Sequence, residues 1–124
     1  MTTEGLARAV YARPNMDLRD PRGLEYELLA RATAALRKAA AEDCQDFPAL
    51  VSAVDRNLRL WSALAADLAS PENALPRELR ARLFYLYEFT AQHSPSILNG
   101  SGSAQVLVDI NTAVMRGLRG GVAA

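Results

Sequence analysis

The chain has 124 residues, which is enough for one domain, and half of them are apolar, which is typical of a globular protein and too high for a disordered one. Its 14 basic side chains balance 14 acidic ones, and this zero net charge argues against bulk electrostatic binding to nucleic acid. Cys44 is the only cysteine, which excludes an internal disulfide and a cysteine-based zinc cluster and fits a reducing compartment.

The N-terminal ten residues carry Glu4 and Arg8 and have no continuous apolar core, so they do not resemble a secretory signal. No stretch approaches the ~18 uninterrupted apolar residues that a membrane-spanning helix needs. We therefore expect a cytoplasmic protein with no membrane insertion.

Prolines divide the chain into segments whose apolar residues recur at helical spacing, and no segment shows the alternation typical of a strand. The first expected helix, residues 4–13, is short and would need to dock on the rest of the protein. The second, residues 21–43, is preceded by Asp20 as its N-cap and starts with Pro21. Its expected core-facing positions are Leu24, Leu28, Ala32, Ala35 and Ala39, flanked by Leu29 and Leu36.

The third expected helix, residues 47–69, has the clearest apolar stripe in the chain and is the expected central packing element. Asp46 is its expected N-cap, and Pro48 falls within its first turn. The stripe consists of Leu50, Val54, Leu58, Trp61, Ala65 and Leu68.

Two further helices complete the expected fold, which is an all-α compact bundle of about five helices. The fourth, residues 76–93, is interrupted by Ser94 and Pro95, and the alternative is that residues 96–99 add one more turn. The fifth, residues 104–118, follows a Gly/Ser stretch expected to be a flexible hinge. We expect one domain over residues 1–124, with residues 1–20 and 119–124 less ordered. The expected core-facing positions of these two helices are Leu79, Leu83, Leu86 and Thr90, then Val106, Ile110, Val114 and Leu118.

The chemistry of an enzyme is not evident in the sequence. There is no glycine-rich phosphate loop, and His93 has no partner ligands at the spacing that a metal site requires. Asp43 and Asp46 are neighbours in a linker, which suggests capping, and the acidic surroundings of Cys44 disfavour its thiolate. We therefore expect a protein that is not an enzyme and that needs neither a metal nor a cofactor.

Two runs of sequence, residues 57–76 and 108–118, resemble the FlaF family of flagellar biosynthesis proteins of alphaproteobacteria. The first contains the triplet Arg59 to Trp61, and the second ends with the Asn-x-x-x-Met-Arg-Gly-Leu pattern that starts at Asn111. The resemblance implies a cytoplasmic chaperone or regulator that supports flagellin synthesis and type III export and works alongside FlbT, a post-transcriptional regulator of flagellin mRNA. A small helical protein with an apolar groove for amphipathic helices is compatible with that role.

The candidate partner-binding residues are Trp61, Phe84, Tyr85, Phe89, Asn111, Met115 and Arg116. For Trp61 the alternatives are a core position and a place at the border of a partner groove. The fourth helix carries more aromatic side chains than one buried stripe needs, which fits either a binding face or a central position of this helix in the bundle. Asn111 is either a satisfied buried polar residue or a partner contact, and Arg116 either binds the carbonyls of its own helix end or a partner.

Three functions remain open from the sequence: a flagellin-binding chaperone, a regulator that acts on RNA or through FlbT, and a purely structural helical subunit. Arg77, Arg80 and Arg82 form the only local basic cluster, and Glu78 lies among them. A solvated helix face is the plainer interpretation of that cluster, so we expect no direct binding to nucleic acid. A further hypothesis makes the fifth helix a lid that moves when flagellin binds.

Overall fold

The computed structural model describes residues 21–41 and 46–119, and over these ranges the protein is all-α. Its helices are α2 (Pro21–Ala40), α3 (Phe47–Leu68), α4 (Arg77–Leu98) and α5 (Ala104–Arg119), and no strand occurs in this part of the chain. The all-helical prediction is thus confirmed. The expected first helix, the Asp20 cap, Cys44 and the C-terminal tail from residue 120 lie outside the described residues.

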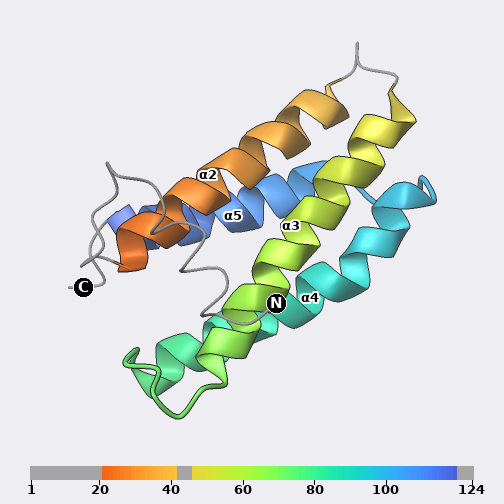
Figure 1. Ribbon diagram of the computed structural model, residues 1–124. Coiled ribbons are helices and arrows are strands. Elements are labelled where there is room, and N and C mark those ends of the chain that lie inside the picture. The colour runs from red at the N-terminus through yellow and green to blue at the C-terminus, as the bar shows by residue number, and fades with distance from the viewer. Residues whose placement is uncertain (1–20, 42–45, 120–124) are drawn as a thin grey trace.

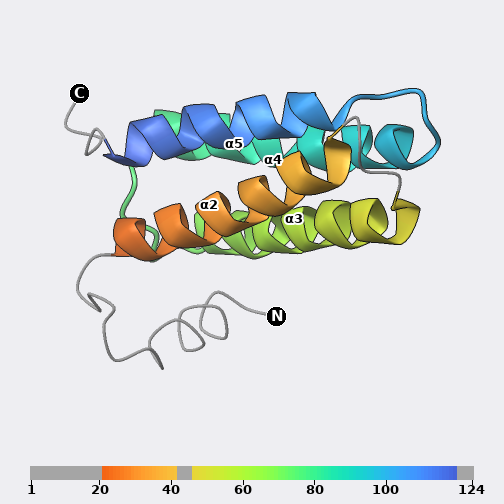
Figure 2. The same ribbon diagram turned by 90° about the horizontal axis from the view of Figure 1, so that it is seen from above.

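The helices form two layers, with α2 and α3 in one and α4 and α5 in the other (Figure 2). Across the layers, α5 packs along α2 and α4 packs along α3. The α2–α5 pair and the α3–α4 pair lie close together at the end where α4 leads into α5, and they separate toward the opposite end (Figure 1). The bundle therefore has a closed end and an open end.

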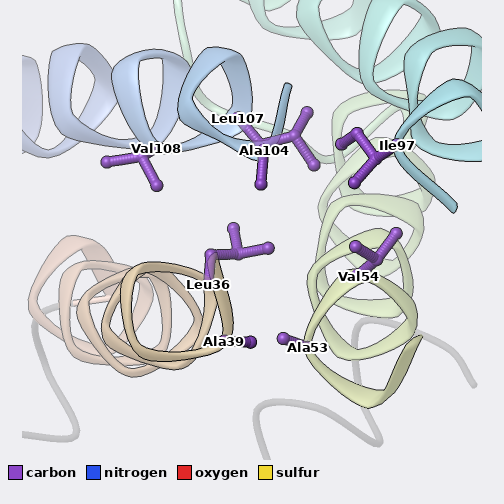
Figure 3. Packing of buried hydrophobic residues seen from close by; sticks show 8 residues of the cluster. All are labelled: Leu36, Ala39, Ala53, Val54, Ile97, Ala104, Leu107 and Val108. Atoms are coloured by element: carbon purple, nitrogen blue, oxygen red, sulfur yellow. The ribbon is translucent and has the colours of Figure 1, made fainter. Parts of the chain in front are cut away.

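The closed end holds a core in which small side chains bring the helices together (Figure 3). Ala39 of α2 and Ala53 of α3 face each other, while Leu36, Val54 and Leu107 point into the space between the helices. The abundance of alanine in the sequence is used here for close helix contact. The buried residues of this cluster are Leu36, Ala39, Ala53, Val54, Ile97, Ala104, Leu107 and Val108.

The open end holds a second cluster around Trp61, with half-buried side chains around it. Its buried members are Leu29, Ala32, Leu60, Trp61 and Met115. Leu64, Leu83, Leu86, Val114 and Leu118 pack against the cluster but remain partly exposed. The core at this end is therefore not fully covered by the described residues.

Asp46 caps the start of α3, whereas Pro95 does not end α4. The Asp46 side chain accepts a hydrogen bond of 3.0 Å from the amide of Ala49, which confirms the predicted N-cap. The predicted interruption of α4 at Ser94 and Pro95 is wrong, because the helix continues through Pro95 to Leu98 and includes the alternative extra turn. Proline removes its own amide donor and its ring crowds the carbonyl four residues earlier, but its own carbonyl can still accept a hydrogen bond. The carbonyl of Pro95 accepts from the amide of Asn99 at 3.1 Å, so the helix continues on its C-terminal side.

The buried faces of α2 and α5 are displaced from the predicted apolar stripes. On α5 the buried line runs through Leu107, Asn111 and Met115, whereas Val106 and Ile110 are only half-buried. Polar residues lie at the middle of both faces: Asn111 on α5, and on α2 Thr33, whose hydroxyl donates to the carbonyl of Leu29 at 2.7 Å. Apolar spacing cannot select such polar positions. On α2 the predicted Ala32 and Ala39 are buried, whereas Leu28 and Ala35 are only half-buried, so that stripe is corrected in part and the stripe of α5 is corrected as a whole.

The expected hinge before α5 is held by hydrogen bonds. Gly100 has φ +88°, the left-handed conformation that glycine adopts after a helix end. The amides of Ser101 and Gly102 both donate to the carbonyl of Ser96, at 2.9 and 2.8 Å. A ring nitrogen of His93 lies 3.0 Å from the carbonyl oxygen of Ser103. The connection therefore fixes the direction of α5 relative to α4.

Candidate functional groove

A groove lies at the open end of the bundle, between α4 and α5, and α3 and α2 form its floor. Its volume is about 590 Å³, which falls in the ~300–1,000 Å³ range of ligand-sized pockets. Trp61 and Leu29, both fully buried by the chain, belong to the floor. The apolar lining also includes Leu64, Leu68, Leu75, Leu79, Leu83, Leu86, Ala113, Val114 and Leu118.

A buried hydrogen-bond chain fixes the floor of this groove. The indole nitrogen of Trp61 donates to Asn111 Oδ1 at 2.9 Å, and Asn111 Nδ2 donates to Asn57 Oδ1 at 2.8 Å. All three side chains have zero exposed fraction. Because a buried polar group without a partner is costly, these two hydrogen bonds hold α5 and α3 in position across the core and fix the orientation of the indole ring.

The charged side chains on the lining are Asp67 from α3, Arg82 from α4 and Arg116 from α5. Both arginines are exposed, whereas Asp67 is half-buried. Neither arginine forms an ion pair within residues 26–41 and 46–118, although ion pairs occur elsewhere in that part of the chain, as between Arg59 and Asp55 at 2.8 Å. The groove is therefore apolar with an excess of positive charge on its lining.

A shallow hollow of about 430 Å³ lies beside the groove on α4 and shares Arg82 and Leu86 with it. Tyr85 and Ala81 complete this hollow, and the side chain of Tyr85 is 66% exposed. Phe84, at 37% exposed, packs edge-on against Tyr87 with ring centroids 5.6 Å apart. Phe84 and Tyr85 thus face outward, whereas half-buried Tyr87 packs against the core cluster around Trp61.

The structure separates the predicted partner-binding residues into three groups. Trp61, Asn111 and Met115 are buried, and Trp61 is both a core residue and part of the groove floor. Arg116 lies on the groove lining, and Tyr85 lies beside it. The other two aromatic candidates do not line the groove. Phe84 belongs to neither hollow, and half-buried Phe89 stacks on the ring of His93 at 5.4 Å.

Sequence reasoning missed Arg82 and the leucines as groove residues. Leu79, Leu83 and Leu86 were assigned to the core because they follow the helical period. In the sequence, an apolar stripe that a neighbouring helix covers fully has the same spacing as one that it covers only in part. The signal for Arg82 was present, since it is a basic residue on the same helix, but its position was interpreted as a solvated face.

Among the residues that the structure describes, no group of three or more His, Cys, Asp or Glu side chains could hold a metal ion. None of the described helices is long and apolar enough to cross a membrane. The fold and the groove define a small all-helical protein with an open, mostly apolar groove.

Comparison with known families agrees with the family resemblance of the two sequence runs. A family model described as flagellar protein FlaF matches residues 7–118. The chain therefore belongs to the FlaF family and is a flagellar protein. No curated protein and no solved structure matches the chain.

Proposed function

We propose that this protein is a cytoplasmic flagellin chaperone whose groove binds an amphipathic terminal helix of flagellin before export. The observation that carries the proposal is the groove between α4 and α5, with its leucine lining and its volume of about 590 Å³. Membership of the FlaF family supports a flagellar client. A helix docked in such a groove would bury apolar side chains spaced at i, i+3, i+4 and i+7.

The apolar lining supplies the driving force for this binding. Leu79, Leu83 and Leu86 lie on one side of α4 and are only partly covered by the chain itself. Covering them with a partner's apolar side chains would remove their exposed area from water, at ~25 cal/mol per Å² of apolar surface. Exported flagellin would in turn be kept from self-association while its apolar stripe is covered.

Geometry favours this function over direct action on RNA. Of the three clustered arginines, Arg77 is exposed, Arg80 is half-buried with its Nε atom enclosed, and Arg82 lies on the groove lining. They do not form one continuous phosphate-binding face. A salt-sensitive gel shift of flagellin leader RNA by this protein alone would contradict this assignment, and the absence of a shift would leave any RNA regulation to a partner such as FlbT.

Co-purification with flagellin tests the proposal. Leu79→Gln and Leu83→Gln alter half-buried groove positions and should reduce flagellin retention by about tenfold or more, because each places an amide in an apolar contact. Phe47→Gln is the control, since Phe47 is 56% exposed and lies outside the groove. Circular dichroism verifies that each variant is folded. Equal retention by wild type and both groove variants would refute the groove as the site, and no retention by wild type would favour a structural subunit without a client.

A further inference from the structure

Two arginines on the groove lining are available to a bound partner. Arg82 projects from α4 and Arg116 from α5, the two helices between which the groove lies. Both are exposed, and neither has an ion-pair partner within residues 26–41 and 46–118. Asp67 is the only acidic side chain among the described lining residues, so positive charge exceeds negative charge there.

The long side chain of arginine suits the edge of an apolar groove. Its methylene stem packs against apolar surface while the guanidinium group stays in water. A partner that covers the groove would remove part of that water from Arg82 and Arg116. Desolvation of a cation is unfavourable unless an anion replaces the lost water, and a carboxylate does so with two parallel hydrogen bonds.

We propose that the groove selects an acidic amphipathic helix, one whose apolar stripe is flanked by Glu or Asp residues that pair with Arg82 and Arg116. The inference rests on the proposed function, because it assumes that a helix occupies the groove, and it adds the charge that this helix must carry. A helix with the same apolar stripe and basic flanks is rejected, since it places like charges beside both arginines.

Three labelled peptides of equal length test this selection by fluorescence anisotropy. They share one leucine stripe and differ only in the flanking residues, which are glutamate, glutamine or lysine. At low salt the glutamate peptide should bind about five- to tenfold more tightly than the glutamine peptide, the factor expected for two solvent-exposed ion pairs. The lysine peptide should bind most weakly, and at about 0.5 M salt the differences should largely disappear.

Matched variants identify the groups responsible. Arg82→Gln combined with Arg116→Gln should abolish the preference for the glutamate peptide, so that the ratio of its affinity to that of the glutamine peptide falls to about one. Arg77→Gln is the control, because Arg77 is an exposed arginine of α4 that does not line the groove. Equal binding of all three peptides by wild type would overturn the charge selection and leave the groove intact as a site. If no peptide bound at all, both the charge selection and the proposal that the groove binds a helix would be overturned.

Discussion

The substitution Asn111→Ala removes the centre of the buried hydrogen-bond chain. It leaves the indole N–H of Trp61 without its acceptor at 2.9 Å and Asn57 Oδ1 without its donor at 2.8 Å. The Nδ2 atom of Asn57 already has no partner among the described residues. An orphaned buried polar group costs about 1–3 kcal/mol, so the two together should lower the free energy of unfolding by about 2–6 kcal/mol. This is a large share of the ~5–15 kcal/mol that holds a domain together.

Urea denaturation followed by circular dichroism measures this loss, and a double-mutant cycle assigns it to the pair. Trp61→Phe removes the other end of the 2.9 Å bond, so the double variant should be more stable than the sum of the single losses predicts, by about 0.5–3 kcal/mol. Gln105→Ala, on the exposed face of α5, is the control and should change stability by less than about 0.5 kcal/mol. The stabilising role of the buried hydrogen bonds would be refuted if the Asn111→Ala variant were as stable as that control. It would also be refuted if the stability losses of the two single variants simply added up in the double variant.

Three smaller substitutions test the helix ends and the loop, each measured by urea denaturation. Asp46→Ala should cost about 0.5–2 kcal/mol, with Asp46→Ser restoring most of it, because the N-cap acceptor of α3 is lost and regained. Gly102→Ala should cost about 1–2 kcal/mol, since its Cβ would lie 2.1 Å from Ser96 Oγ, and adding Ser96→Ala should recover part of the loss; no recovery would contradict the clash. Gly117→Ala should instead stabilise α5 by up to about 1 kcal/mol, because no neighbouring atom lies within 4 Å of the added Cβ, and a destabilised variant would contradict this.

Local signals were sufficient for most of the fold. The extent of α3 followed from Asp46, Pro48 and an apolar stripe that all indicate the same helix. The end of α4 could not be predicted in this way, because Pro95 is a strong helix breaker in isolation. Here the helix continues past it to Leu98, and Thr90, Ser94 and Ile97 on either side of it are buried in the bundle. Packing of the neighbouring turns against the rest of the bundle therefore determines where α4 ends.

The groove could be predicted only in part, because it arises from the angle between helix pairs. Trp61 and Arg116 were singled out from the sequence, and both lie on the groove. Val114 and Leu83 follow the same helical period as residues of the closed end, yet they line the groove. The helix pairs diverge toward the open end (Figure 1). That divergence depends on which side chains meet at the closed end, which is information about several helices at once and is not contained in the periodicity of any one.

The position of α5 bears on the hypothesis that it acts as a lid. Undocking it would expose Leu107, Val108 and Met115, all buried, at about 1.5–3 kcal/mol each, and would also break the bonds of Asn111. That sum approaches the stability of a whole domain, so opening α5 would amount to unfolding. We therefore expect a partner to enter a preformed groove. Hydrogen exchange should show that amides near Leu107 keep their protection when flagellin binds, whereas those from Val114 gain some; reduced protection at Leu107 on binding would instead support the lid.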